Sequence, residues 1–205
     1  REAPDHRGLE HRVERASQQR NGHALDATCE RSTATAMRPC VTMQFSIRAF
    51  SETDADAVAS WRYEPPYDVY DVRADGSLDE EMRDPVRWGT SWFAVDDAAT
   101  GELVGFLELV ASESESATGT QVAVEVGLGL RPDLTGQGLG ASFVDAALEF
   151  SRERWSPRTF ALDVFPWNER AIRTYERAGF DRGEVYDRTF EDGNVVTFLR
   201  MLRTA

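Results

Sequence analysis

Three glycines separate a strand pattern from a helix pattern in the segment LRPDLTGQGLGASFVDAALEF, residues 130–150. They are Gly136, Gly138 and Gly140. Because glycine has no Cβ, backbone amides at these positions can approach an anion closely, and the N-terminus of the helix that follows adds about half a positive charge. The order of strand, Pro-containing turn, glycines and amphipathic helix therefore predicts a cradle for a diphosphate group.

Other interpretations of the glycines are weaker but remain open. Glycine clusters often form only a tight turn. A P-loop would need Lys and Ser or Thr after the glycines, whereas the sequence continues Gly140-Ala141-Ser142. A dinucleotide fingerprint would need the spacing G-x-G-x-x-G, whereas this segment has G-x-G-x-G.

The hydrophobic periodicity from Met43 onward predicts one α/β domain. Strand patterns and helix patterns follow one another, and no internal repeat interrupts them. The segment 112–120, SESESATGT, is expected to be a solvated loop. We therefore expect a mixed, mostly antiparallel sheet flanked by helices. Strands are expected at 45–50, 91–97, 102–110, 121–130, 159–165, 181–190 and 194–203, and helices from Thr53, at 79–88, after Gly140 and at 168–178.

The charge is strongly negative and all the basic residues are arginine. The chain has 23 Arg, no Lys and 36 acidic residues, for a net charge of −13. Such a surface repels nucleic acid and anionic membranes, so neither is expected as a partner. An acidic protein from a GC-rich genome would show this composition. The coincidence of acid enrichment with the absence of Lys favours a cytoplasmic protein of a salt-accumulating halophile.

Residues 1–42 differ from the rest of the chain. They lack periodic apolar residues and read as a disordered or non-native extension, which leaves residues 43–205 as the folded domain. All three His and both Cys, Cys29 and Cys40, lie in this extension. The domain therefore has no Ser-His-Asp triad, no Cys nucleophile and no ordinary zinc site, and we expect no metal.

A second motif lies downstream of the glycines. In LDVFPWNERAIRTYERAGF, residues 162–180, Asn168 and Tyr175 are seven residues apart, so they share one helix face. Together, the two segments resemble the GNAT superfamily of N-acetyltransferases. The first matches its diphosphate motif, R/Q-x-x-G-x-G/A, and the second matches its Asn, Ala, Tyr and Gly-Phe positions with Asn168, Ala171, Tyr175 and Gly179-Phe180.

The resemblance implies splayed central strands and a set of residues that bind acetyl-CoA. The strand before the glycines would hold the pantetheine arm through its backbone, and Asn168 would contact the same arm. Thr135 departs from the family, which usually has Arg or Gln there, so a side-chain contact to phosphate is weakened. The expected cofactor-binding residues are Leu128, Gly129, Leu130, Thr135, Gly136, Gln137, Gly138, Leu139, Gly140, Ala141 and Asn168.

The implied reaction is direct attack of a primary amine on acetyl-CoA in a ternary complex. An amine with a pKa of about 10.4 must lose a proton first, and Asp163 or Glu125 is expected to accept it, through water. Tyr175 would protonate the departing thiolate. Each has another interpretation: Glu125 is solvated, Asp163 pairs with an arginine, or Tyr175 only packs in the core.

The acceptor is expected at the loop WRYEPPYDVYD, residues 61–71. Its aromatic and acidic side chains suit a cationic, partly apolar amine, although they could instead pack down around Pro65-Pro66. A small amine, an antibiotic and a protein N-terminus all remain open as acceptors, and the enzyme is expected to be a monomer or homodimer. The expected acceptor residues are Tyr63, Glu64, Tyr67 and Tyr70.

Two alternatives would use the same glycines without acetyl transfer. One is a catalytically silent CoA-binding sensor or scaffold, which would not need Tyr175 or the two carboxylates. The other is a nucleotide-binding protein that uses the glycine cradle differently.

The charge composition generates a prediction about salt. If the acidic surface is an adaptation to salt, we expect the protein to unfold or lose activity in dilute buffer, because self-repulsion is then unscreened. Thermal unfolding in dilute buffer and in molar KCl measures this. Equal stability under both conditions would contradict the halophile hypothesis.

Overall fold

The computed structural model describes residues 43–72, 77–116, 119–190 and 193–205. The chain divides into two units, Arg1–Pro39 and Cys40–Ala205, and the described residues belong to the second. The expected extension at 1–42 lies outside them. The described elements are β1 Phe45–Ala49, α2 Glu52–Ala59, η2 Tyr67–Tyr70, α3 Ser77–Arg83, η3 Pro85–Arg87, β2 Trp92–Asp97, β3 Leu103–Ser116, β4 Gly119–Leu130, η4 Pro132–Leu134, α4 Gly140–Trp155, β5 Thr159–Val164, α5 Glu169–Arg177, β6 Asp181–Thr189 and β7 Val195–Thr204.

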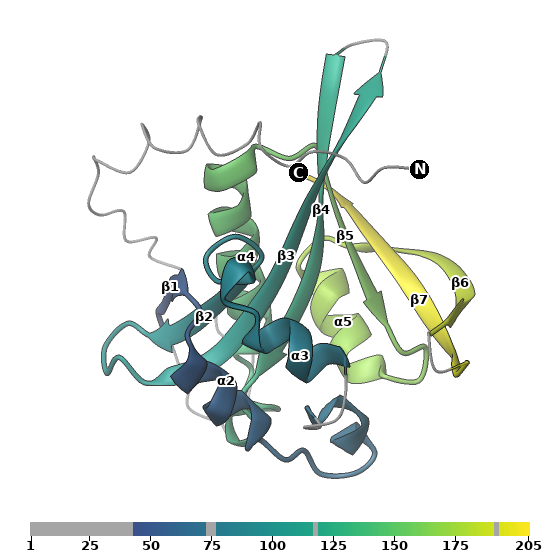
Figure 1. The fold of residues 1–205 in the computed structure, drawn as a ribbon. Helices are drawn as coiled ribbons and strands as arrows, with labels where there is room; N and C mark the ends of the chain where they lie inside the picture. Colours follow the sequence, from purple (N-terminus) through teal and green to yellow (C-terminus); the bar gives the residue numbers. More distant parts are fainter. Residues whose placement is uncertain (1–42, 73–76, 117–118, 191–192) are drawn as a thin grey trace, which may run out of the picture. The chain divides into compact units, whose positions relative to one another are not determined.

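The strands form one sheet in the order β1-β2-β3-β4-β5-β7-β6 (Figure 1). Neighbouring strands are antiparallel except β4 and β5, which run parallel. The α/β class and the mixed, mostly antiparallel sheet that the periodicity predicts are confirmed.

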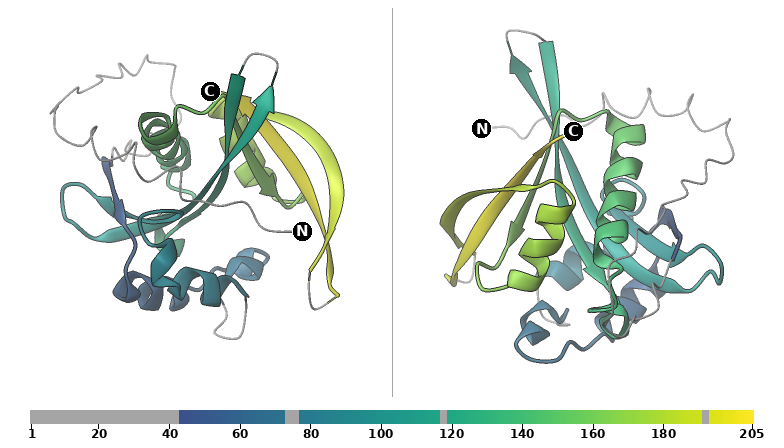
Figure 2. Two further views of the ribbon diagram at one scale, coloured as in Figure 1. Left: turned by 45° about the horizontal axis from the view of Figure 1, so that its top comes forward. Right: turned by 180° about the vertical axis from the view of Figure 1, so that it is seen from behind.

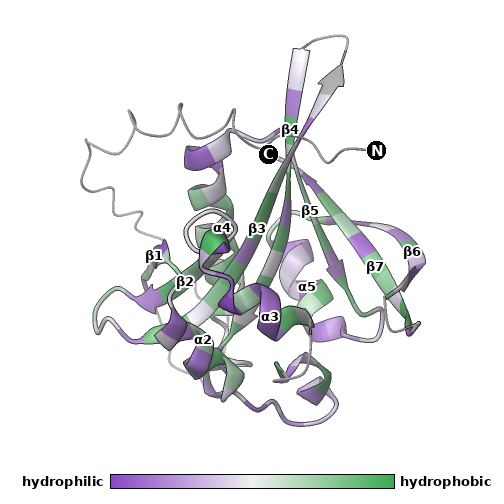
Figure 3. Cartoon of the chain, in the orientation of Figure 1, coloured by the Kyte–Doolittle hydropathy of each residue, from purple (hydrophilic) through white to green (hydrophobic). Residues whose placement is uncertain are grey.

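Helices cover both faces of the sheet (Figure 2). Helices α4 and α5 lie on one face, where Phe143 and Ile172 enter the main core beside Val124 and Phe160. Helices α2 and α3 lie on the other face, over a smaller core that includes Trp61. In Figure 3 apolar residues recur along β3, β5 and β7. The sheet therefore offers one face to the main core and leaves part of the other for a site.

A charged cluster fastens α2 to the sheet. Arg48 on β1 donates to the carboxylates of Asp54 on α2 and Asp96 on β2, each at 2.7 Å. Burial alone would raise the pKa of Asp54, but hydrogen bonds from Arg48 and Ser51 outweigh it and hold the pKa below its usual value. Ser51 caps the helix, so α2 begins before the expected Thr53.

The β3–β4 hairpin is longer than the sequence predicts. The segment expected to be a loop at 112–120 continues both strands, from Ser112 paired with Ala123 to Ser116 paired with Gly119. Alternating Ser and Glu residues suit a strand that has water on both faces, and period-two apolar analysis does not detect such a strand. The polar end of the hairpin is visible in Figure 3.

Strands β4 and β5 separate soon after they meet. They pair only from Ala123–Thr159 to Glu125–Ala161, whereas β4 pairs with β3 along its whole length. Beyond Glu125 the two parallel strands diverge (Figure 1). The far end of β4 therefore has one backbone edge that β5 does not cover, and this edge leads directly into the glycine segment.

Candidate functional site

The glycine segment forms an open loop between β4 and α4. Gly136 and Gly138 have φ values of +75° and +87°, a conformation that side-chain-bearing residues rarely adopt. A Cβ at either position would meet no atom of the described structure within 4 Å. These two glycines are therefore required by backbone conformation, and no atom of the described residues fills the place that a side chain at either position would take.

The loop presents unpaired backbone amides. No side chain caps α4, whose N-cap residue is the buried Leu139. Within the described residues, no backbone carbonyl or side chain accepts a hydrogen bond from the amides of residues 137–142. The first turn of α4, which includes Ala141, thus supplies N–H groups and the positive end of the helix dipole to one place. That arrangement binds anions.

The other residues of the loop have structural contacts. A Cβ on Gly140 would lie 2.9 Å from Thr174 Cγ2, so this glycine permits close packing of α4 on α5. Thr135 Oγ1 donates to the carbonyl of Pro132 at 2.8 Å, and Gln137 Nε2 donates to the carbonyl of Asp133 at 2.6 Å. Both polar side chains therefore stabilise the turn itself.

The end of β4 directs backbone groups into the gap between β4 and β5. Arg131 N–H bonds to Val104 on the β3 side, and the β3–β4 register has no bulge. Because strand edges alternate, Leu128 and Leu130 direct their N–H and C=O groups away from β3. The Tyr63 hydroxyl donates to the Leu130 carbonyl at 2.9 Å.

A stack of aromatic rings places the 61–71 loop over this gap. The Phe106 ring covers Gly129, where a Cβ would lie 2.2 Å from a ring atom. Trp61 is buried against Phe106, with ring centroids 6.2 Å apart. Tyr63 follows two residues later, so the residues expected at the acceptor lie against the backbone expected to bind the cofactor.

Asn168 and Tyr175 lie on α5 as the spacing predicts. Asn168 caps the helix by accepting from Ala171 N–H at 3.1 Å, and its Nδ2 donates to the Tyr70 hydroxyl at 2.8 Å. In the described part of the chain, the Tyr175 hydroxyl has no hydrogen-bond partner. Burial raises the pKa of Tyr175, and Tyr70 raises it further, so this hydroxyl keeps its proton at neutral pH.

The two expected proton acceptors share one arginine. Arg200 on β7 contacts Asp163 at 2.8 Å and Glu125 at 2.6 Å, which joins β4, β5 and β7 on one face of the sheet. Tyr186 on β6 also donates to Asp163, at 2.6 Å. The arginine partner left open for Asp163 is found. Glu125 has the same partner, and its side chain is also exposed to solvent, as the other interpretation has it.

Sequence reasoning missed a third carboxylate on this face, Glu108 on β3. It is half-buried and lies opposite Gly127 of β4; a Cβ there would be 3.4 Å from Glu108 Oε2. Among the described residues, Glu108 forms no ion pair or hydrogen bond. Burial raises its pKa. Glu108 is the single charged residue in the strand segment GFLELV, residues 105–110, so the sequence offered a signal. Only the pairing of β3 with β4 shows that it lies next to Gly127, on the strand that borders the gap. The charged groups that act on it are Glu81 on α3, Glu125 on β4, Arg87 on η3 and Arg188 on β6.

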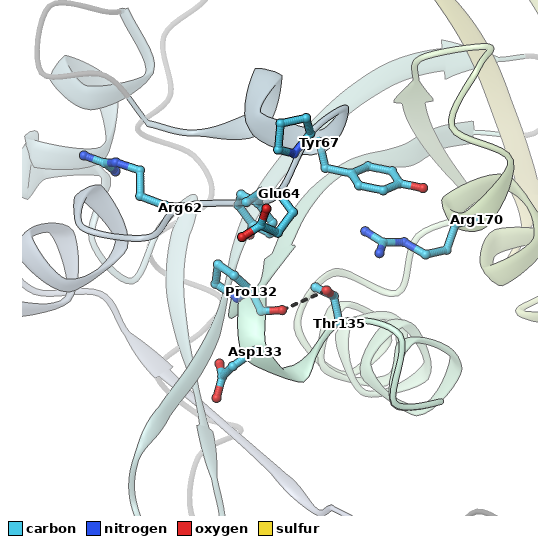
Figure 4. Close-up of a pocket in the computed structure, with 9 residues that line it drawn as sticks. Arg62, Glu64, Tyr67, Pro132, Asp133, Thr135 and Arg170 are labelled. Atoms are coloured by element: carbon cyan, nitrogen blue, oxygen red, sulfur yellow. Dashed lines mark hydrogen bonds between the residues drawn. The ribbon is translucent and has the colours of Figure 1, made fainter.

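A cavity of about 440 Å³ lies beside the glycine loop (Figure 4). One wall comes from the 61–71 loop, the opposite wall from the turn before Gly136, and the third from Arg170 of α5. The Arg170 guanidinium lies 3.9 Å from the centre of the Tyr67 ring. The lining residues are Arg62, Tyr63, Glu64, Pro65, Tyr67, Pro132, Asp133, Thr135 and Arg170.

The described residues contain no group of three or more His, Cys, Asp or Glu residues that could hold a metal ion. None of their helices is both long enough and apolar enough to cross a membrane.

Comparison with known proteins identifies the family. The sequence model of the acetyltransferase (GNAT) family matches residues 55–180, which include the glycine loop, the splayed strands and α5. The chain belongs to the GNAT acetyltransferase family. GNAT proteins of this kind are acyltransferases, and the expected enzyme class is confirmed. The curated proteins contain no sequence that matches this chain.

Solved structures show the same GNAT fold. A spermidine N-acetyltransferase from Vibrio cholerae, in complex with CoA and spermine, is 21% identical; the match covers 78% of this chain and 95% of the other, with a TM-score of 0.56. A GNAT acetyltransferase from Bacillus anthracis is 17% identical over 80% and 96% of the two chains, with a TM-score of 0.61. A putative phosphinothricin N-acetyltransferase is 16% identical over 78% and 98%, with a TM-score of 0.54.

Proposed function

We propose that the protein is an N-acetyltransferase that moves the acetyl group of acetyl-CoA to a primary amine by direct attack in a ternary complex. The observation that carries this proposal is the opening between β4 and β5, which begins beside a loop of unpaired amides. A thioester attached to a diphosphate by a long arm requires both features: amides for the diphosphate, and an open strand edge for the arm.

The residues present fit acetyl-CoA. The amides of residues 137–142 and the open space beside Gly136 and Gly138 suit its diphosphate. The free edge of β4 at Leu128 and Leu130 suits the amide groups of its arm. Tyr63 holds the Leu130 carbonyl, and it would have to release this group or share it with the arm.

Acetyl-CoA, when bound, supplies the thioester. The N–H groups of Leu128 and Leu130 point into the gap and would stabilise negative charge that develops on the carbonyl oxygen. Tyr175 is half-buried, its raised pKa keeps the hydroxyl protonated, and that hydroxyl has no partner among the described residues, as a donor to the leaving thiolate would be. No acyl-enzyme is invoked, since no Cys or His occurs after residue 42.

Three carboxylates on the open face could take the proton of the amine. Asp163 and Glu125 were expected in this role, and Arg200 occupies an oxygen of each. We therefore include Glu108, whose oxygens have no such partner in the described residues. Its raised pKa brings the carboxyl closer to the value that suits a base near neutral pH.

The acceptor proposed here is a small cationic amine. The spermidine acetyltransferases among the solved neighbours support this class. On the open face, Glu125, Asp163 and Arg200 together leave one net negative charge. The carboxylate of Glu108 adds a second, and this negative face favours an ammonium group. A protein N-terminus remains the second candidate, and a catalytically silent CoA-binding protein is the alternative from another class.

A pair of glycine variants tests the diphosphate cradle. Gly138→Ala and Gly101→Ala both place a Cβ in open space at positive φ, at +87° and +72°. We expect similar losses of stability, of about 1 kcal/mol, because the backbone strain is the same in kind. Only Gly138→Ala should weaken acetyl-CoA binding, by at least about tenfold in a titration. Equal affinities in the two variants would mean that the loop is only a turn.

A carboxamide variant tests the proton acceptor. Glu108→Gln should lower kcat by about a hundredfold and leave acetyl-CoA affinity unchanged. The carboxylate form is lost as the pH falls through the raised pKa of Glu108, so the acid limb of the rate profile should lie above the usual carboxyl range and disappear in the variant. Glu113→Gln, on the exposed part of the same strand, is the control. A larger loss in Glu125→Gln or Asp163→Asn would assign the base elsewhere.

Removal of one hydroxyl separates an enzyme from a silent binder. Tyr175→Phe keeps the ring that packs 6.2 Å from Phe180. We expect kcat to fall about 10²-fold or more, with little change in acetyl-CoA affinity or melting temperature. The measurement requires an accepted amine from a panel that includes polyamines. If kcat is unchanged while stability falls, Tyr175 only packs in the core. If the wild type acetylates no amine, the silent binder is favoured.

A further inference from the structure

Arg170 has no acidic partner among the described residues, in a chain rich in acids. It is half-buried and stacks on Tyr67. Among the described residues, its guanidinium forms no ion pair and no hydrogen bond. Arg173, one turn along the same helix, pairs with Glu169 at 3.9 Å, so acids are within reach of α5. A stacked guanidinium keeps its N–H donors in a fixed plane, ready for an anion.

The position of Arg170 relative to the glycine loop is set by helix packing. Thr174 Oγ1 donates to the Arg170 carbonyl at 3.0 Å, one turn away. The same Thr174 packs against Gly140, the first residue of α4. Arg170 and Thr135 therefore line the same cavity from different elements, and Figure 4 shows both.

Thr135 does not supply the long polar side chain, Arg or Gln, that the family usually has at this point. Its hydroxyl already donates to Pro132, and its side chain is too short and too weakly polar to replace a guanidinium. The acidic residues of the cavity do not neutralise Arg170 either. Asp133 is held by Arg131 at 2.8 Å, and the Glu64 carboxylate points toward Pro132 in Figure 4.

We propose that Arg170 of α5 binds the diphosphate of acyl-CoA and so replaces the side chain missing at position 135. The proposal rests on the proposed function. A guanidinium matches two phosphate oxygens with parallel N–H donors, and Tyr67 holds it in that orientation. The diphosphate is then bound by backbone amides from α4 on one side and by a side chain of α5 on the other.

Three acyl donors and two variants test this proposal by titration at one KCl concentration. The donors are acetyl-CoA, acetyl-dephospho-CoA, which lacks the 3′-phosphate, and S-acetylpantetheine, which lacks the diphosphate. Arg170→Gln should raise the Kd for the first two at least about tenfold and leave the third unchanged. Arg173→Gln removes the same charge one turn away and should change no Kd more than about twofold.

Rescue by a second substitution makes the test independent of the folding of one variant. Thr135→Arg in the Arg170→Gln background should recover most of the lost affinity for acetyl-CoA, because it returns a guanidinium to the family's usual position. Arg170→Lys, which keeps the charge but not the fork, should bind with intermediate affinity. Melting temperatures of all variants verify that the compared proteins are folded.

Several results would overturn the assignment. Equal acetyl-CoA affinity in the wild type and in Arg170→Gln would show that Arg170 binds no phosphate. A loss for acetyl-CoA alone would assign it to the 3′-phosphate, and an equal loss for S-acetylpantetheine would assign it to the shape of the cavity. If the wild type binds none of the three donors, the proposed function itself fails, which the other outcomes do not imply.

Discussion

Strand β4 is hydrogen-bonded to β3 along its full length but to β5 over only three residue pairs, and the candidate site depends on this difference. A strand with a partner on each side has no backbone group to offer a ligand. Past Glu125 one edge of β4 is released, while its other edge stays paired with β3 as far as Leu130. Since side chains alternate along the strand, the same segment serves three purposes. Val124 and Val126 fill the core, Glu125 lies on the open face, and Leu128 and Leu130 direct backbone groups into the gap.

Backbone groups would also let a chain of charge −13 bind the proposed diphosphate. The long-range field of such a protein repels a diphosphate, but that field is screened within about a Debye length, whereas amides and a helix dipole act at contact distance. Most arginines described here are paired with acids and contribute little local attraction. Arg170, stacked on Tyr67, is therefore the side chain best placed to add to the backbone contacts.

Arg200 organises the part of the open face where β4 and β5 still pair. It joins Glu125 and Asp163 across three strands and occupies oxygens that a base would use. One cation between two carboxylates leaves the group with a net negative charge, and Glu108 adds another. The open face therefore remains suited to an ammonium group, while the choice among the three carboxylates as base depends on which keeps a free oxygen.

Local patterns were sufficient for much of this protein. The glycines before a helix, the helix start at Asn168 and the seven-residue spacing of Asn168 and Tyr175 are local signals, and strand and helix periods gave the order of the elements. The positive φ at Gly136 and Gly138 and the side-chain cap by Asn168 were not predicted. The predicted ends of elements were less accurate. Ser51 caps α2, which therefore begins before Thr53. The Ser-Glu alternation after Val110 belongs to β3, and it was missed because a strand with polar residues on both faces has no apolar period.

The tertiary structure decided the contacts between segments that are distant in the sequence. The Tyr63 bond to Leu130 spans 67 residues, the Arg200 bond to Glu125 spans 75, and the Asn168 bond to Tyr70 spans 98. No local pattern encodes such pairs, because each depends on strand register and on which helix covers which face. The sequence by itself determined the glycine cradle and the helix that follows it, since backbone conformation is a local property. Only the packing of the sheet and helices decided that Glu108 lies beside Gly127, that Arg200 binds both expected bases and that Arg170 lines the cavity. These positions depend on many weak contacts between distant segments, which form together when the chain folds.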